Sequence, residues 1–201
     1  MQKLKPSFYR HPDVLHVAKA LLGQHLVTIV NGQRTAGMIV ETEAYAGAID
    51  RASHAFGNRR TKRTEVMFGA GGIAYVYLCY GMHHLFNVVT NVQDVPHAVL
   101  VRALQPLEGI DIMLARTGKP ALNYTLTNGP GSLCKALHIT TADTGASLSG
   151  DHIFIEKAAP IPAADIVAGT RVGVAYAKED ALLPYRFSIR DNPWVSRGKG
   201  L

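Results

Sequence analysis

Three polar side chains at alternate positions stand out in the segment MIVETEAYAGAIDRASHAFG, residues 38–57. They are Glu41, Glu43 and Tyr45, and most of their neighbours are apolar. Because alternate residues of a strand point to one face, this spacing predicts two carboxylates and a phenol side by side. A carboxylate among apolar neighbours is partly desolvated, which raises its pKa and makes it a better base. Most such pairs simply line a solvated strand face, and that alternative stays open.

His54 follows nine residues after Tyr45 and allows a second kind of chemistry. With Glu41 and Glu43 it could form a metal site of two carboxylates and one imidazole. The sharper metal motifs HExxH and CxxC are absent from the sequence. A lone histidine is more often structural than a ligand, so the metal site is the weaker alternative.

A second segment, IAYVYLCYGMHHLFN at residues 73–87, is rich in tyrosine. Tyr75 and Tyr77 suit a strand by propensity, and packing in the core could explain both. Tyr80 stands beside Gly81-Met82, which predicts a turn with an exposed ring at its tip. Aromatic rings can sandwich a flat molecule, and an exposed ring can fill the gap left by an extruded base. Together with the carboxylates, the tyrosines indicate chemistry on a nucleobase.

The composition is compatible with a nucleic-acid partner. The chain has 201 residues, 47% of them hydrophobic, and a formal charge of +6, which favours a polyanionic partner without proving one. Basic residues crowd NRRTKR at 58–63, which could be a solvated loop or a strip of phosphate contacts. Arg102 lies among apolar residues, and a buried arginine needs a partner such as Glu41 or Glu43.

The two cysteines, Cys79 and Cys134, lie in apolar runs without the spacing of a disulfide framework or metal site. Both are therefore expected to be reduced core residues. The first residues contain no apolar signal core, and no apolar run reaches membrane-spanning length. We expect a soluble cytoplasmic protein.

Hydrophobic periodicity and turn residues predict an α+β fold with a largely antiparallel sheet. An Asn31-Gly32 turn should join strands at 24–30 and 33–43, and a second hairpin should join 74–80 to 84–90. Pro12 should open a helix at 13–22, which Gly23 stops. Further strands are expected at 98–104, 152–156, 171–176 and 186–189, further helices at 109–116 and 132–137, and a loop at 48–63.

Taken together, these segments resemble the alkyladenine (3-methyladenine) DNA glycosylase family over nearly the whole chain. The resemblance is carried by VETEAYAGAIDRASHA, AYVYLCYGMHHLFNVV, AVLVRALQPLEG, NGPGSLCKAL, RVGVAY and RFSIRDNPWVSR. It implies a single domain, residues 1–201, in which helices flank a curved sheet and a protruding β-hairpin enters DNA. It also implies a monofunctional hydrolase of base excision repair, without lyase activity and without a metal or organic cofactor.

The implied substrates are alkylated or deaminated purines, namely 3-methyladenine, 7-methylguanine, hypoxanthine and ethenoadenine. The enzyme would flip them out of duplex DNA and hydrolyse the N-glycosidic bond, which leaves an abasic site. The expected partner is double-stranded DNA with a damaged purine. A monomer is expected, associated with the nucleoid and not with a membrane.

The resemblance also implies roles for individual residues. Glu43 would be the general base that activates water, and Arg102 would help to hold that water together with the main chain near Val172. Tyr45 and Tyr77 would sandwich the flipped base. The base pocket would consist of Tyr45, His54, Tyr77, Asn87 and Val172, with Asn87 placed to exclude the exocyclic amine of guanine.

The implied DNA contacts lie on the hairpin and in the basic segment. Tyr80 would be the intercalating wedge, with Met82 and His83 beside it, and Arg59 and Thr61 would contact phosphates. The chain departs from the family pattern at Ser132, where a phosphate-contacting lysine is common, and Lys135 could compensate. Thr64 and His83 are further departures.

Two other functions stay open at this point. A non-catalytic DNA-binding module would explain the charge and Tyr80 but gives no role to Glu43. A metal hydrolase would use the carboxylates and His54 but leaves the tyrosines without a role. No lysine lies at the motif positions, so we expect hydrolysis by water without a Schiff base.

Overall fold

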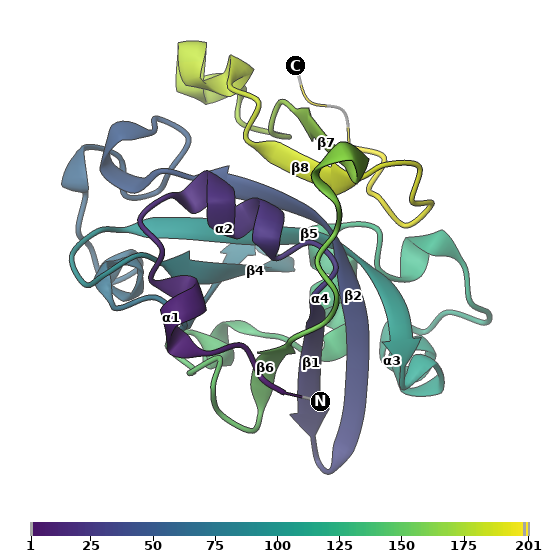
Figure 1. Cartoon of the computed structure of the whole chain (residues 1–201). Helices are drawn as coiled ribbons and strands as arrows, with labels where there is room; N and C mark the ends of the chain where they lie inside the picture. The colour runs from purple at the N-terminus through teal and green to yellow at the C-terminus, as the bar shows by residue number, and fades with distance from the viewer. Residues whose placement is uncertain (1, 199, 201) are drawn as a thin grey trace.

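One curled antiparallel sheet forms the framework of the computed structural model, which describes residues 2–198 and 200 (Figure 1). The strand order is β3-β4-β5-β2-β1-β6, and β8 pairs with both β2 and β7. The α+β class and the largely antiparallel sheet are therefore confirmed. The strands are β1 (His25–Val30), β2 (Gln33–Tyr45), β3 (Ala74–Cys79), β4 (His83–Thr90), β5 (His97–Glu108), β6 (Ile153–Glu156), β7 (Ile166–Gly169) and β8 (Arg186–Ile189).

The first predicted hairpin, β1–β2, turns at Asn31 and Gly32. Both residues have positive φ, 52° and 74°, as a two-residue type I′ turn requires. Val30 pairs with Gln33 across the turn. Strand β2 continues two residues beyond the predicted end, so Tyr45 is still part of the sheet when the chain leaves it.

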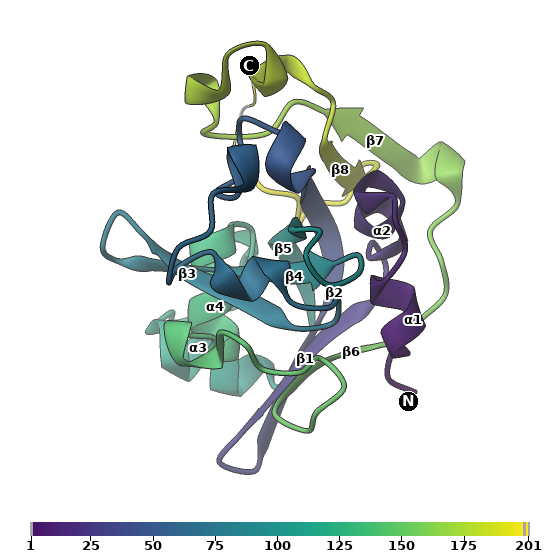
Figure 2. The ribbon, with the colours of Figure 1, turned by 90° about the vertical axis from the view of Figure 1, so that its left-hand side faces the viewer.

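The second predicted hairpin, β3–β4, extends from the rest of the sheet, at the left of Figure 2. Its tight turn is closed by a hydrogen bond from the Met82 N–H to the Cys79 carbonyl at 3.1 Å. Tyr80 and Gly81 occupy the turn with φ of 50° and 71°. The turn therefore includes Tyr80 itself, one residue earlier than predicted.

Among the described residues, four short α-helices support the sheet: α1 (Pro6–Tyr9), α2 (Val14–Ala20), α3 (Ile110–Thr117) and α4 (Pro130–Leu137). Helix α2 packs on β2 and β5, and α4 packs on β4 and β5, so the main core lies between these helices and the sheet. Asp13, not Pro12, begins α2, because its carboxylate caps the Leu15 N–H at 2.8 Å. No helix within the described chain is long and apolar enough to cross a bilayer.

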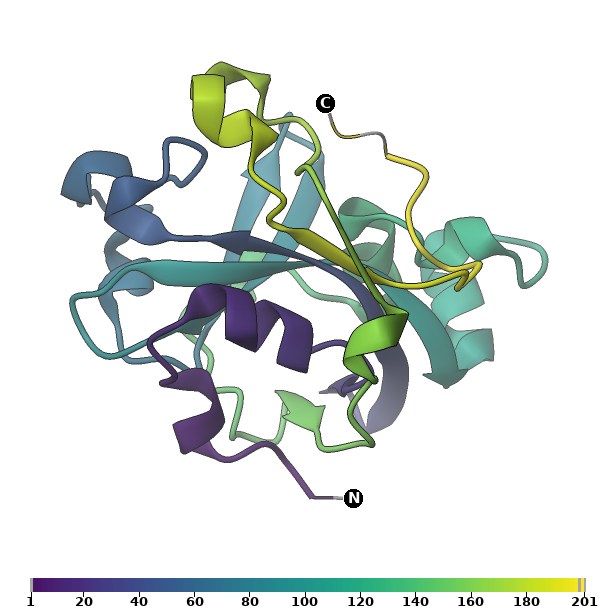
Figure 3. The ribbon, with the colours of Figure 1, turned by 45° about the horizontal axis from the view of Figure 1, so that its top comes forward.

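The remaining regular segments are single turns of 3₁₀ helix and one longer run. They are η1 (Gly47–Ile49), η2 (Phe56–Asn58), η3 (Glu65–Phe68), η4 (Tyr124–Leu126), η5 (Thr141–Asp143), η6 (Ala163–Asp165) and η7 (Ala175–Leu182). The expected loop at 48–63 thus contains two 3₁₀ turns. Strand β8 runs beside the end of β2, as Figure 3 shows in yellow and dark blue.

The strand predicted at 171–176 is wrong. The chain there is irregular and leads into η7. The Val172 N–H donates to a side chain and not to a neighbouring strand, and Gly173 has a φ of 75°, outside the extended region. Arg171 is fully buried by side-chain and carbonyl partners, so this apolar-looking run is held by an ion pair.

Irregular pairing of β2 with β5 places the polar residues of the sheet. Ile39 pairs with Leu104, Glu41 with Ala103 and Thr42 with Val101, so Arg102 has no partner across the ladder. An extra residue of this kind is a β-bulge, which bends the strand and re-aims a side chain. The bulge turns Arg102 toward the carboxylates of β2.

Candidate active site

Glu43 is completely buried and held by three donors. Its Oε1 accepts the Val172 N–H at 2.7 Å and lies 3.1 Å from Arg102 Nη1, and its Oε2 accepts the Tyr45 hydroxyl at 2.8 Å. Burial raises the pKa of Glu43, although Arg102, the Val172 amide and the Tyr45 hydroxyl each oppose this rise. The result is a fixed carboxylate with the raised basicity that proton abstraction needs.

Glu41 has different surroundings, although it is equally buried. Its Oε1 accepts Arg102 Nε and Ser196 Oγ, both at 3.0 Å, and lies 3.4 Å from Arg186 Nη1. Its Oε2 accepts the Ser196 N–H at 2.8 Å. Oε1 thus binds both Arg102 and Ser196, and Oε2 binds Ser196. Glu41 therefore joins β2 to the segment that contains Ser196. The two predicted carboxylates share one face through Arg102, which contacts both.

A cavity of about 650 Å³, here called the base cavity, lies beside the residues that hold Glu43. It has the size of a small-molecule pocket. Glu43 is not among the described residues that line it, but Tyr45, Arg102 and Val172, which hold Glu43, all do. Of the other predicted residues, the structure brings the following to the same cavity: His54, Tyr77, Asn87, Tyr80 and His83.

An aromatic cluster forms one wall of the base cavity. The ring centroids of Tyr77 and His54 are 4.7 Å apart, and His54 Nδ1 lies 2.8 Å from the Tyr75 hydroxyl. Burial and the nearby Arg63 and Arg59 lower the pKa of His54 to about 4, so its imidazole is neutral at physiological pH. Arg63 lies over the Tyr77 ring at 5.0 Å. A neutral histidine and aromatic faces suit the edge and the faces of a flat heterocycle.

Asn87 closes the wall at the base of the hairpin. Its side chain is 4% exposed, and Nδ2 donates to the carbonyls of Tyr75 at 3.1 Å and Leu85 at 3.3 Å. The amide is therefore fixed to the hairpin backbone while the residue lines the cavity. These two bonds fix the position of the amide in the cavity wall.

The tip of the β3–β4 hairpin is apolar and exposed. Tyr80 is 88% exposed, Met82 69% and Leu78 44%. Tyr80 lies at the edge of the base cavity, while Met82 borders a different hollow and His83 borders both. Three large apolar side chains exposed together on one hairpin make this tip a candidate contact surface.

The basic segment 58–63 divides into cations with different partners. Arg60 pairs with Glu65 at 2.7 Å and with Asp94 at 2.9 Å, so it stabilises the loop. Arg63 belongs to the base cavity. Arg59 and Thr61 are exposed beside them, outside the cavity lining. Within the described chain, Arg59 and Lys62 make no ion pair. Arg59 and Lys62 are thus the cations of this segment that remain available to bind a partner.

Sequence reasoning missed a buried ion pair behind the cavity. Arg171 Nη1 and Nη2 contact Asp50 at 2.5 and 2.9 Å, and the guanidinium lies 4.9 Å from the centroid of the Tyr45 ring. Arg171 immediately precedes Val172, so the pair fixes both the amide and the ring that hold Glu43. The sequence carries a weak signal, the isolated arginine of RVGVAY.

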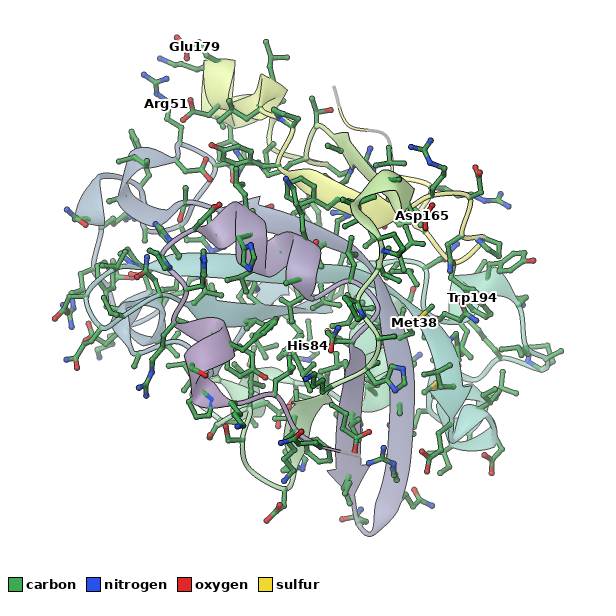
Figure 4. The ribbon with its side chains drawn as sticks, viewed as in Figure 1. Met38, Arg51, His84, Asp165, Glu179 and Trp194 are labelled. Carbon is green, nitrogen blue, oxygen red and sulfur yellow. The ribbon has the colours of Figure 1, made fainter. Side chains whose placement is uncertain are left out.

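Two C-terminal contacts were also missed. Ser196, in the closing motif, binds both oxygens of Glu41. Near the other end of the site, Arg51 and Glu179 form an ion pair at 2.8 Å that ties the loop after η1 to η7; Figure 4 labels both residues. Cys79 is only half-buried and lines the base cavity, so its expected core position is wrong, whereas Cys134 is buried.

The geometry does not gather the alternative metal ligands. His54 Nδ1 contacts Tyr75, whereas Glu41 and Glu43 contact Arg102. Among the residues that the structure describes, no three His, Cys, Asp or Glu side chains are grouped to hold a metal ion.

Comparison with known proteins identifies the group to which the chain is similar. A family model described as Methylpurine-DNA glycosylase (MPG) matches residues 7–193. A Bacillus cytotoxicus protein is 50% identical over 97% of this chain and 100% of its own length. Proteins of Bacillus cereus strain B4264 (51%) and Bacillus anthracis strain A0248 (50%) match over 96% of this chain and 98% of theirs. All three are named "Putative 3-methyladenine DNA glycosylase". The expected resemblance is confirmed, and the chain belongs to the methylpurine-DNA glycosylase family of DNA repair hydrolases.

Proposed function

We propose that this protein is a monofunctional DNA glycosylase that hydrolyses the N-glycosidic bond of damaged purines with a water activated by Glu43. Its substrates would be 3-methyladenine, 7-methylguanine, hypoxanthine and ethenoadenine, flipped out of duplex DNA. One observation carries the proposal: Glu43 is buried behind the wall of the base cavity, and the three residues that hold it, Arg102, Val172 and Tyr45, line that wall.

The reaction needs a base and a stabiliser of positive charge, and Glu43 supplies both. As the C1′–N9 bond breaks, its electron pair leaves with the purine and positive charge develops on the sugar. The carboxylate stabilises that charge and takes a proton from the water whose oxygen attacks C1′. Arg102, which contacts Oε1, would help to hold the water together with the main chain near Val172. The product is an abasic site.

Recognition of the base would use the cavity walls. Tyr45 and Tyr77 both line the cavity, and stacking between them suits the electron-poor ring of a methylated purine. His54 would contact the edge of the base in its neutral form. Asn87, fixed by two carbonyls, would clash with the exocyclic amine of guanine.

The side chains around the cavity support hydrolysis without strand cleavage. Lyase activity in a glycosylase needs an amine that attacks C1′ and forms a Schiff base. No lysine lies among the described residues that line the base cavity. We therefore propose that water is the only nucleophile.

Contact with DNA would begin at the hairpin. Tyr80 would enter the duplex as a wedge, with Met82 and His83 beside it, and Arg59 and Thr61 would contact phosphates of the damaged strand. The partner would be duplex DNA with a damaged purine. We propose that residues 1–201 form one glycosylase domain that acts as a monomer in the cytoplasm, near the nucleoid, with no cofactor.

The deciding experiment compares Glu43→Gln with the parent on methylated and hypoxanthine-containing duplexes. Single-turnover excision should fall by at least about 10²–10⁴, the usual contribution of a general base, because the amide cannot accept the proton. Binding to the damaged duplex should stay within roughly tenfold, because the amide keeps the shape of the carboxylate. Glu41→Gln is the matched control, with circular dichroism to check folding, and should lose less activity. The reverse order would mean that Glu41 is the base.

A further inference from the structure

A second cavity of about 390 Å³ lies beside the base cavity and has no role in the chemistry above. It is bordered by the hairpin and by α4. Its lining contains two permanent cations and three histidines: Arg116, Lys135, His83, His84 and His138. His84 is labelled in Figure 4. None of the described residues that line this second cavity is acidic.

The two cations of the second cavity lack a counterion. Arg116 Nη1 donates to the Ala136 carbonyl at 3.2 Å and to Thr35 Oγ1 at 3.3 Å, and Lys135 Nζ contacts the Thr117 carbonyl at 3.4 Å. Within the described chain, neither forms an ion pair. Burial lowers the pKa of Arg116, which is the effect expected of an uncompensated cation, although a guanidinium stays charged. The pair of positive charges is thus available to an anion.

The hairpin separates the second cavity from the base cavity. Tyr77 and Leu85, which pair across the hairpin, line the base cavity, whereas His84 lines the second cavity. His83 packs on Gly131 of α4 so closely that a Cβ there would lie 2.9 Å from Nδ1. These two residues border both cavities and form the dividing wall.

Ser132 and Lys135 lie one turn apart on α4 but line different cavities. Ser132 lines the base cavity, whereas Lys135 lines the second cavity. A phosphate bound by Lys135 would therefore lie at a different place from one bound near Ser132.

We propose that the second cavity binds a backbone phosphate of the DNA strand opposite the damaged base. The inference rests on the proposed function, because it requires the hairpin to enter the duplex. A hairpin that enters a DNA groove has one sugar–phosphate backbone on each side. The flipped nucleotide would hold the backbone of the damaged strand at the base cavity. The other backbone then faces the second cavity. Phosphate oxygens would accept bonds from Arg116, Lys135 and the His138 ring.

The test measures affinity against salt concentration for DNA with a stable abasic-site analogue. Lys135→Gln removes one phosphate contact, and Lys157→Gln removes the same charge from a residue that lines neither cavity. Each contact contributes about one unit to the slope of log K against log salt. On duplex DNA, Lys135→Gln should lower the slope by about 1, while Lys157→Gln and Lys135→Arg should keep the parent slope. On the damaged strand alone, Lys135→Gln should match the parent.

Two outcomes overturn the inference. If Lys135→Gln and Lys157→Gln give the same slope on duplex DNA, the second cavity holds no phosphate. If Lys135→Gln lowers the slope equally on single-stranded DNA, the phosphate belongs to the damaged strand. Excision of hypoxanthine by the parent is measured in parallel. A parent that excises normally while the slopes fail separates failure of this inference from failure of the proposed function.

Discussion

At the scale of single residues, the two carboxylates on one face of β2 differ in the groups that donate to them. Both oxygens of Glu41 are engaged by Arg102 and Ser196. Glu43 receives the Val172 amide and Arg102 on Oε1 and the Tyr45 hydroxyl on Oε2. A carboxylate oxygen has two lone pairs, so Oε2 of each carboxylate, which accepts one donor, keeps one free. The difference lies in the donors: Tyr45 and Val172 line the base cavity, whereas Ser196 does not. The strand pattern alone could not distinguish these two environments.

The Tyr45 hydroxyl should tune the basicity of Glu43. Its hydrogen bond favours the ionised carboxylate, so Tyr45→Phe should raise the pKa of Glu43 further while keeping the ring that stacks. Because the base must be ionised, the acidic limb of 7-methylguanine excision should move to higher pH in Tyr45→Phe.

The control for Tyr45→Phe is Tyr176→Phe. Tyr176 also lines the base cavity, but its hydroxyl donates to the Ala52 carbonyl at 3.0 Å and not to Glu43. Its pH profile should match that of the parent. An unmoved acidic limb in Tyr45→Phe would show that the phenol does not act through Glu43.

Asn87→Ala should change both selectivity and stability, because the amide lines the cavity and also binds the hairpin. Loss of two hydrogen bonds to buried carbonyls should lower the free energy of unfolding by about 1–3 kcal/mol, measured in urea. Loss of the amide volume should increase release of guanine relative to hypoxanthine on mixed substrates. A stability loss with an unchanged product ratio would leave Asn87 a purely structural residue.

At the scale of elements, the turn of the β3–β4 hairpin holds a tyrosine where its backbone is unfavourable. A φ of 50° suits Gly or Asn, and a bulky residue there costs of order 1 kcal/mol. Since the ring is 88% exposed, packing does not offset this cost. A strained and exposed aromatic residue is best explained by a partner that receives it.

Tyr80→Asn removes the proposed wedge but keeps the turn, because Asn tolerates positive φ. The free energy of unfolding should stay equal or rise by up to about 1 kcal/mol. Binding to a damaged duplex should weaken by about 1–3 kcal/mol, the usual worth of base–aromatic stacking, and less on single strands. Leu122→Ala, which removes an exposed apolar side chain outside both cavities, is the control. A lower melting temperature with unchanged binding would move the wedge to Met82 or His83.

The regular elements could be predicted from the sequence where local chemistry decides them. Asn31-Gly32 fixes one hairpin, and the alternation around Glu41 and Glu43 fixes a strand and its polar face. The position of Arg102 could be suspected from its apolar neighbours, but the bulge that turns it toward both carboxylates depends on the register between β2 and β5. Register is a property of two strands and not of one.

The irregular segments were least predictable, because their contacts join distant parts of the chain. Residues 171–176 read as a strand, yet Arg171 binds Asp50 and Val172 binds Glu43, each more than a hundred residues away. Ser196 binds Glu41 across a similar distance. Contacts between distant residues produce no periodic pattern in the sequence. The residues that hold the two carboxylates and their neighbours could therefore be identified only from the structure.

At the scale of the whole molecule, the net charge of +6 says less than the distribution of partners. Arg34, Arg51 and Arg60 neutralise carboxylates and stabilise the fold. Arg116 and Lys135 line the second cavity beside the hairpin and form no ion pair within the described chain. They are therefore two cations, next to the hairpin that carries the exposed Tyr80, that a polyanion could bind.

At this scale one half-buried histidine, His54, should make a destabilising contribution in mild acid. The pKa of His54 is lowered from 6.5 to about 4 in the folded protein, so between these values the unfolded chain binds a proton that the folded chain does not. Above pH 6.5 the imidazole is neutral in both states and costs the folded protein no stability. As the pH falls from 6.5 toward 4, the unfolded chain gains the proton and the free energy of unfolding decreases. At about 1.4 kcal/mol per unit, the loss is at most about 3 kcal/mol. Glu43, with its raised pKa, acts in the opposite direction.

Replacement of His54 isolates its share of this acid sensitivity, because Glu43 titrates in both proteins. His54→Gln keeps a polar group near the Tyr75 hydroxyl but cannot titrate. In urea titrations from pH 7 to pH 4, the unfolding free energy of the parent should fall more steeply than that of His54→Gln, by up to about 3 kcal/mol. His16→Gln, an exposed histidine outside both cavities, should follow the parent curve. Parallel curves for the parent and His54→Gln would mean that His54 is not held neutral at the cavity wall, and its proposed contact with the base edge would then involve a cation.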